Sequence, residues 1–295
     1  MPVETTKVKS TGLHIGEIAP GVAKVDPIII VDNVTRTYGG LKAVDIHHLE
    51  IPRGAITALI GPNGAGKTTF FNLITGFDKA DTGSWTFNGR SLAGMSAFRI
   101  SRLGQIRTFQ LTRSLAMLSV LENMKLGARD QRGENFWVSL IPWLWRAQDN
   151  EIEARAIDLL TRFQLDSKQH DYAASLSGGQ RKLLEMARAL MSEPTLVMLD
   201  EPMAGVNPAL TQSLLEHILN LKRDGMTVLF VEHDMQMVRH IADWVVVMAE
   251  GRVVAEGPPD IVMKNTAVID AYLGSHLDTD LGIVTGRVDE NGAIL

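Results

Sequence analysis

The chain contains no cysteine among its 295 residues. Disulfide bridges and thiolate-bound metal are therefore excluded, and with them the class of small secreted proteins held together by disulfides. Long apolar runs are missing as well: runs such as residues 27–31, 55–60 and 244–249 are far shorter than the ~20 residues that span a bilayer. Residues 1–27 lack the apolar centre of a secretory signal. We therefore expect an intracellular, soluble chain, with any membrane-spanning part on another polypeptide.

A strongly basic character is also absent. The chain has 34 acidic and 29 basic residues, which gives a formal charge of −5 at pH 7. Proteins that bind nucleic acids usually present a basic surface, because they neutralise phosphates. We therefore expect no nucleic-acid partner.

Short β-type runs alternate with helix-type segments over most of the chain, which is typical of a parallel sheet covered by helices. Residues 111–176 differ, because apolar side chains recur there at helical spacing and indicate an inserted helical subdomain. Strands are expected at residues 28–35, 43–51, 55–60, 84–87, 196–199 and 227–231, a helix at 66–75, and a closing hairpin at 244–249 and 253–255.

These patterns divide the chain into three parts. Residues 1–26 form a polar extension with little reason to pack, and residues 27–275 form the main cassette, which includes the helical insert. Residues 276–295 form a tail of mixed polarity without an assigned role. No second copy of the motifs described below is visible, so we expect one cassette per chain.

A glycine-rich loop follows the expected strand at residues 55–60. Residues 61–68 read Gly-Pro-Asn-Gly-Ala-Gly-Lys-Thr and satisfy the phosphate-binding pattern G-x-x-x-x-G-K-T. Glycines let the backbone approach phosphates closely, and the helix that follows adds the partial positive charge of its N-terminus. The residues expected to contact the nucleotide are Asn63, Gly64, Ala65, Gly66, Lys67, Thr68 and Thr69.

Two side chains of this loop have specific expected roles. Lys67 would reach the β- and γ-phosphates, and the hydroxyl of Thr68 would bind Mg²⁺. The alternative is a glycine-rich turn with a surface lysine, which the surrounding strand–loop–helix pattern disfavours.

Two acidic residues, Asp200 and Glu201, directly follow the apolar strand at residues 196–199. Ionised carboxylates are costly to bury alone, so a cation partner is expected there. In a chain with a phosphate-binding loop, Asp200 fits the acid that organises Mg²⁺ and Glu201 fits the residue that polarises an attacking water. Without that loop, the pair would more often be a solvated turn.

A second helix N-terminus lies at residues 176–180, Leu-Ser-Gly-Gly-Gln. Ser177 and Gln180 have the spacing of a capping box, which explains them structurally. Two glycines at a helix start also leave the backbone open to a ligand, as in an anion site. The residues alone leave both explanations open.

The segment 176–180 resembles the signature motif of ATP-binding-cassette (ABC) ATPases, and it precedes the acidic strand as in that family. Tyr38 resembles the aromatic residue that stacks on adenine, Gln110 the Q-loop glutamine, and His233 the switch histidine, while residues 204–207 resemble the D-loop. The resemblance implies an α/β P-loop NTPase fold with a RecA-like parallel sheet, an N-terminal antiparallel β subdomain and the inserted α-helical subdomain. It also implies ATP and Mg²⁺ as ligands. The metal ligands would be Thr68, Gln110 and Asp200.

The same resemblance implies ATP hydrolysis at a site shared between two subunits. Lys67 would hold the γ-phosphate, Glu201 would activate water, and His233 and Gln110 would sense or stabilise the γ-phosphate. In this family the signature segment of one subunit closes over ATP bound to the other, which implies a homo- or heterodimer. The signature residues expected to act across that interface are Ser177, Gly179 and Gln180.

A finer similarity is to the ATPases of branched-chain amino acid importers. It rests on residues 38–44 (YGGLKAV), 107–110 (RTFQ), 120–123 (VLEN), 232–235 (EHDM) and 268–274 (VIDAYLG). One departure is the full Leu-Ser-Gly-Gly-Gln, where several such importers carry a Tyr-Gly-Gln-Gln variant. The similarity implies a peripheral subunit on the cytoplasmic face of the membrane. Its implied partners are two transmembrane permease subunits, a second ABC ATPase and, indirectly, an extracytoplasmic solute-binding protein.

Three alternatives stay open. The tryptophan-rich residues 136–145, with residues 115–128, are candidate contacts to the permeases, but tryptophans also fill cores, including that of the insert itself. The whole chain is alternatively a soluble ABC ATPase that acts as an assembly or regulatory switch, or the ATPase of a lipid exporter. The transported solute is set by other chains.

Overall fold

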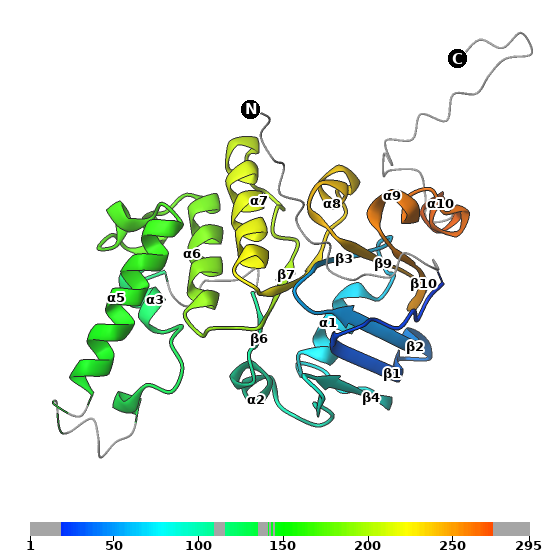
Figure 1. Cartoon of the computed structure of the whole chain (residues 1–295), viewed down its shortest axis with the longest axis horizontal. Helices are drawn as coiled ribbons and strands as arrows, with labels where there is room; N and C mark the ends of the chain where they lie inside the picture. Colours follow the sequence, from blue (N-terminus) through cyan, green and yellow to red (C-terminus); the bar gives the residue numbers. More distant parts are fainter. Residues whose placement is uncertain (1–18, 109–115, 135–140, 142, 144, 274–295) are drawn as a thin grey trace, which may run out of the picture.

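Two β-sheets organise the computed structural model, which describes residues 19–108, 116–134, 141, 143 and 145–273 (Figure 1). The smaller sheet has four strands in the order β2-β1-β4-β5, and its strand pairs are antiparallel. Its strands are β1 (Pro27–Tyr38), β2 (Leu41–Pro52), β4 (Thr82–Phe87) and β5 (Arg90–Ser91).

The larger sheet has six strands in the order β10-β9-β3-β8-β7-β6. All of its neighbouring strands pair in parallel except the closing hairpin of β9 and β10. Its strands are β3 (Ile56–Ile60), β6 (Gln105–Arg107), β7 (Leu196–Asp200), β8 (Thr227–Val231), β9 (Trp244–Ala249) and β10 (Arg252–Gly257).

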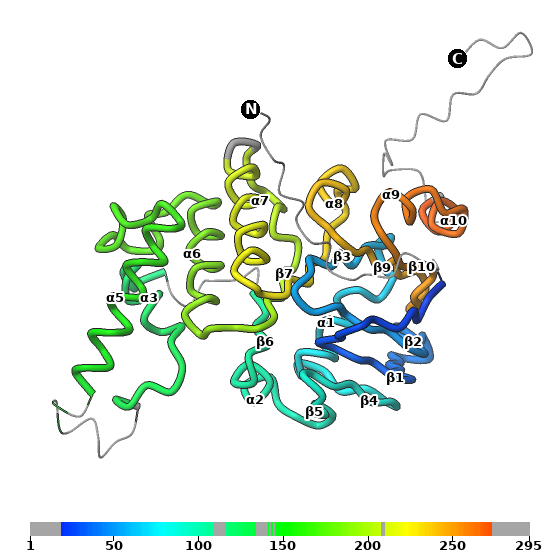
Figure 2. Tube along the Cα trace, in the orientation of Figure 1, coloured from blue at the N-terminus to red at the C-terminus, as the bar shows by residue number. Residues whose placement is uncertain are grey.

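Helices cover this sheet, and α3, α5 and α6 pack together as a separate helical lobe beside it (Figures 1 and 2). Within the described residues, no helix is long and apolar enough to cross a membrane. The α-helices are α1 (Lys67–Ile74), α2 (Ala97–Arg102), α3 (Val120–Lys125), α5 (Arg146–Arg162), α6 (Gly178–Leu190), α7 (Pro208–Arg223), α8 (Met235–Ile241), α9 (Pro259–Val262) and α10 (Thr266–Leu273). Within the described part of the insert, 3-10 helices include η2 (Arg132–Glu134), η4 (Asp166–Lys168) and η5 (Ala173–Ser175).

The six-stranded sheet separates two hydrophobic clusters. Successive side chains of a strand point to opposite faces, and here both faces are buried. On β8, for example, Val228 and Phe230 face the cluster formed with α6, α7 and α8, whereas Leu229 and Val231 face α1 and the small sheet. Continuous apolar runs such as residues 227–231 therefore form central strands.

The expected fold class is confirmed: a parallel sheet is joined to an antiparallel β subdomain and a helical insert. Most expected strands are present, and several are longer than expected; the first, for example, continues through Tyr38. Of the tryptophan-rich segment, Trp143 and Trp145 are described: Trp143 is 78% exposed, so it does not fill the insert's core, and Trp145 is half-buried at the start of α5. The domain limits at residues 27, 111, 176 and 275 stay predictions.

The expectation of an unpacked extension up to residue 26 is wrong for residues 21–24. Glu256, which is fully buried on β10, accepts hydrogen bonds from the backbone amides of Gly21 (2.7 Å) and Val22 (3.0 Å). It also accepts from Lys24 Nζ (2.8 Å) and Trp244 Nε1 (2.9 Å). The lysine ammonium lies 4.4 Å from the Trp244 ring centroid. Sequence patterns missed this packing because the partner is more than 200 residues away.

We predict that Glu256→Gln lowers the free energy of unfolding by about 3 kcal/mol, because an amide nitrogen replaces one of two buried oxygens that face only donors. Urea unfolding would measure it. The matched control is Asp260→Asn, whose side chain is 73% exposed and pairs with Arg239; its expected cost is below about 1 kcal/mol. Equal losses of unfolding free energy in the two variants would contradict a stabilising role for the buried contacts of Glu256.

Candidate active site

The carboxyl ends of four parallel strands bring the candidate residues together. Leu59 of β3 and Asp200 of β7 are both in register with Val231 of β8, and Arg107 of β6 is in register with Met198 of β7. The loops that follow these strands therefore leave one edge of the sheet side by side. In open α/β sheets this edge is where ligands bind.

The phosphate-binding loop leads from β3 into α1. The cap residue Gly66 has a φ of 95°, and a Cβ there would lie 2.2 Å from the carbonyl oxygen of Ala43, so only glycine fits. No side chain caps α1, and its first turn has no acidic residue. Its first amide groups are therefore left to an anion, while Asn63, Gly64 and Thr68 are exposed and within reach of one.

Lys67 places its ammonium inside this loop. Its Nζ donates hydrogen bonds to the carbonyl oxygens of Gly61 (2.6 Å) and Pro62 (2.9 Å). Burial lowers the pKa of Lys67, and the negative charges of Glu201 and Asp200 oppose that shift. The lysine thus lies between the loop and the two acids, where a phosphate would be held.

The two acids differ in surroundings. Asp200 Oδ2 accepts a hydrogen bond of 2.6 Å from Arg107, whose side chain is 7% exposed. Glu201 is half-buried, and its backbone has a φ of 45°, which is uncommon for a residue other than glycine. Its amide donates to the carbonyl oxygen of Val231 (3.1 Å).

The neighbouring strand supplies His233 to the same edge. Its side chain is 61% exposed, and Nδ1 lies 3.7 Å from Oε2 of Glu232. Glu232 is 1% exposed and accepts from the backbone amides of Met203 (3.1 Å) and His233 (3.3 Å). Burial raises the pKa of Glu232. The buried glutamate joins the loop after Glu201 to the histidine.

The sequence did not identify Lys182 as a site residue. From α6 its Nζ donates to the carbonyl oxygens of Glu201 (3.4 Å), Pro202 (3.0 Å) and Ala204. Burial lowers the pKa of Lys182, opposed by nearby carboxylates. A lysine on a helix carries no sequence signal that separates this role from a solvated one.

The signature segment begins α6 and does hold a capping box. The backbone N–H of Gln180 donates a hydrogen bond to Ser177 Oγ (3.2 Å), and the backbone N–H of Ser177 donates one to Gln180 Oε1 (3.0 Å). A Cβ at Gly179 would lie 1.6 Å from a terminal methyl carbon of Leu210, so any larger residue there would have to displace that side chain. Ser177 and Gly178 are exposed. Capping therefore explains the motif's fold and still leaves its surface open to a ligand.

The structure does not bring every expected residue to one place. In Figure 1, α6 belongs to the helical lobe, whereas α1 lies beside β1 and β2, so the signature and the phosphate-binding loop are on different parts of the chain. Tyr38 is 46% exposed, its hydroxyl bonds to Asp78, and the Arg36 guanidinium lies 4.6 Å from its ring centroid. Gln110 lies outside the described residues.

The donor set suits Mg²⁺ bound together with a nucleotide. The expected protein ligands with described positions, Thr68 and Asp200, offer oxygen atoms, which Mg²⁺ prefers. Among the residues that the structure describes, no group of three or more His, Cys, Asp or Glu side chains would hold a metal by itself. Mg²⁺ in proteins commonly keeps one or two carboxylates and takes its other ligands from substrate phosphates and water.

Comparison with known proteins agrees with this geometry. Residues 44–204 match the family described as ABC transporter, and residues 252–278 match the family described as branched-chain amino acid ATP-binding cassette transporter. A probable branched-chain amino acid transport ATP-binding protein LivG of Archaeoglobus fulgidus is 41% identical, over 84% of this chain and 96% of that protein. The high-affinity LivG protein of Escherichia coli K12 is 38% identical, over 84% and 98%.

Solved structures give the same result. A nucleotide-free ATP-binding cassette of an ABC transporter has a TM-score of 0.73 and 35% identity, covering 83% of this chain and 98% of its own. The dimeric structure of MJ0796, a bacterial ABC transporter cassette, has a TM-score of 0.66 and 25% identity, covering 78% and 98%. The chain therefore belongs to the ABC transporter ATP-binding family, whose members are ATPases. Within that family its C-terminal match and its relatives are those of branched-chain amino acid cassettes.

We predict that Lys67→Met weakens ATP binding by at least about tenfold, because a buried cation that faces the phosphates is lost. The control Lys79→Met changes an exposed lysine and should leave binding unchanged. Calorimetric titration with ATP in the presence of EDTA measures both. Equal binding by the two variants would show that Lys67 does not contact phosphate.

Proposed function

We propose that this chain hydrolyses ATP to ADP and phosphate and thereby energises an ABC importer of branched-chain amino acids. The observation that carries the catalytic part is the shared sheet edge, where Lys67, Asp200, Glu201 and His233 follow parallel strands. The relatives' names support the choice of solute.

Each side chain has a distinct task in the proposed reaction. Lys67 and the first amides of α1 hold the phosphates, and Glu201 takes the proton of the attacking water. His233, exposed on the same edge, donates to the γ-phosphate. Asp200 and Thr68, with Gln110, would hold Mg²⁺, which neutralises charge on the phosphate oxygens.

The proposed working form has two ATPase subunits, identical or related. Ser177 and Gly178 are exposed at the start of α6, and α6 lies in the helical lobe apart from α1, the helix that follows this chain's own phosphate-binding loop (Figure 1). A second subunit that faces the signature segment would bring its own phosphate-binding loop against that segment, with ATP between them. The dimeric cassette structure among the solved relatives supports this arrangement.

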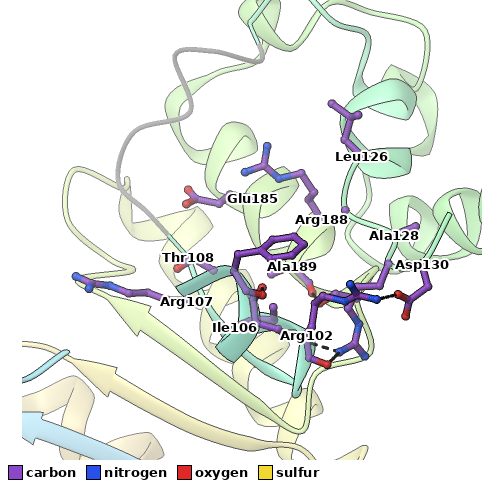
Figure 3. Close-up of a pocket in the computed structure, with 15 residues that line it drawn as sticks. Arg102, Ile106, Arg107, Thr108, Leu126, Ala128, Asp130, Glu185, Arg188 and Ala189 are labelled. Carbon is purple, nitrogen blue, oxygen red and sulfur yellow. Dashed lines mark hydrogen bonds and ion pairs between the residues drawn. The ribbon is translucent and has the colours of Figure 1, made fainter. Parts of the chain in front are cut away.

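A groove beside β6 is the proposed docking place for a permease (Figure 3). It has a volume of about 390 Å³ and lies between α2, β6, α6 and the turn after α3. Phe98 and Leu126 line it and are 69% and 58% exposed. Arg188 also lines it, together with Glu185, whose charge acts on Arg188. Exposed apolar side chains beside Arg188 fit a cytoplasmic permease segment that carries an apolar residue next to an acidic one.

With these assignments, the chain is proposed to be a peripheral subunit on the cytoplasmic face of the membrane. Gentle detergent extraction of the tagged chain from its native membrane should recover two permeases and a second ATPase. A solute-binding protein would join them only indirectly. Recovery with soluble partners alone would contradict a role in transport and would favour an assembly or regulatory ATPase. Recovery with lipid-export components would instead indicate that the chain energises lipid export and not amino acid import.

For catalysis, we predict that Glu201→Gln retains ATP binding and lowers kcat by about 100-fold or more, because the amide cannot accept the proton of water. The matched control is Glu216→Gln, an exposed glutamate on α7, which should hydrolyse ATP normally. Phosphate release measures turnover. Near-normal turnover by Glu201→Gln would refute its role as general base.

For docking, we predict that Phe98→Asp removes the permeases from the detergent extract, because an added carboxylate disrupts the apolar contact. The ATPase activity of the isolated subunit should persist. Ile157→Asp, an exposed apolar site on α5, is the control and should keep the permeases. Permeases retained equally by both variants would exclude this groove.

A further inference from the structure

Arg107 connects the groove-lining strand to the catalytic edge. It is the last residue of β6 and, like its neighbours Ile106 and Thr108, it borders the groove. Successive side chains of a strand alternate in direction. In Figure 3 Arg107 accordingly points away from Arg102 and Asp130. Its side chain is 7% exposed, so it is directed into the protein on the catalytic side.

Two polar groups fix this guanidinium. Nη2 donates to Oδ2 of Asp200 at 2.6 Å, and Nη1 donates to Oδ1 of Asn72, also at 2.6 Å. The guanidinium carbon lies 5.5 Å from the ring centroid of Phe71. A planar guanidinium can hold two partners at fixed relative positions, which an ammonium cannot do. Arg107 therefore ties the acid at the end of β7 to helix α1.

The bridge from Arg107 to Asp200 and Asn72 is relevant to metal binding because it connects one expected Mg²⁺ ligand, Asp200, to the helix that carries another, Thr68. Asn72 is on the helix that starts at Lys67 and carries Thr68, an expected Mg²⁺ ligand. Asp200 is the other expected ligand with a described position. The ion pair uses Oδ2 of Asp200, so Arg107 does not occupy Oδ1. The bridge thus sets the orientation of one ligand relative to the helix that carries the other.

We propose that Arg107 is a positioning residue for Mg²⁺ binding: by bridging Asp200 and Asn72, it holds the Asp200 carboxylate in the orientation that receives the metal with the nucleotide. This inference rests on the proposed nucleotide site. It does not depend on the permease or on the transported solute.

A simple counter-ion would have the opposite effect. Two positive charges repel, so an arginine that merely neutralised Asp200 would compete with Mg²⁺, and its removal would strengthen metal binding. A positioning residue instead resembles the outer partners of metal ligands, whose loss weakens metal affinity by about 10- to 100-fold. The sign of the change therefore separates the two roles.

The test measures binding of a non-hydrolysable ATP analogue by calorimetry, with Mg²⁺ and with EDTA. For Arg107→Met we expect binding in Mg²⁺ to weaken by about tenfold and binding in EDTA to stay within about twofold of wild type. Arg107→Lys keeps the charge but cannot span both partners, so it should show most of the same loss. Full rescue by lysine would overturn the bridging role, and tighter Mg²⁺-dependent binding by the methionine variant would overturn the positioning role.

Two further variants make the result specific. Arg162→Met removes an arginine of α5 that pairs with Asp224 outside the groove, and it should leave both affinities unchanged. Asn72→Ala removes only the far end of the bridge and should give a smaller loss in Mg²⁺ alone. It carries the test if Arg107→Met does not fold, and unchanged Mg²⁺ binding by Asn72→Ala then counts against the proposal.

Failure of this inference is distinguishable from failure of the proposed function. If the wild-type chain does not bind the analogue at all, the nucleotide site itself is wrong. If it binds with Mg²⁺ dependence that Arg107→Met leaves intact, the site stands and the role of Arg107 falls.

Discussion

The parallel pairing of β3, β8, β7 and β6 is the constraint on which the rest of the structure depends. Parallel strands end at the same edge, so residues far apart in sequence, such as Lys67, Asp200 and His233, leave the sheet as neighbours. Pairing of this kind requires helical crossovers and two covered faces, which α1 and α7 help to supply. Two of the acids at this edge have partners that make their burial tolerable: Arg107 for Asp200, and two backbone amides for Glu232.

Contacts behind this edge connect it to the rest of the cassette. Lys182 reaches from the signature helix α6 to the carbonyl oxygens that follow Asp200, including that of Glu201. Glu232 joins the same loop to His233. Arg107 reaches it from the strand that lines the groove. In the proposed transporter, a movement at the partner ATPase or at the permease would thus reach the catalytic loop through direct, partly buried polar contacts.

The sequence predicted the fold class and the main site motifs, because apolar runs and glycine spacing are local signals. The phosphate-binding loop at residues 61–68 and the acids after residues 196–199 are examples, and their strand context is confirmed. Long-range polar contacts escaped prediction: Lys24 with Glu256, Lys182 with the catalytic loop, and Arg107 with Asp200. Such pairs join chain segments whose proximity only the fold determines, and each member alone is typical of a solvated surface residue. The roles of the individual site residues stay predictions.

The proposed nucleotide site is divided between two subunits. Light scattering of Glu201→Gln with ATP and Mg²⁺ tests this division, because blocked hydrolysis preserves the ATP-bound dimer. We expect a dimer that requires nucleotide and that is lost in the double variant with Ser177→Arg, which adds bulk and charge to the exposed signature surface. If the chain stays monomeric with bound ATP even when mixed with its second ATPase, or if it dimerises equally with Ser177→Arg, the shared site is contradicted.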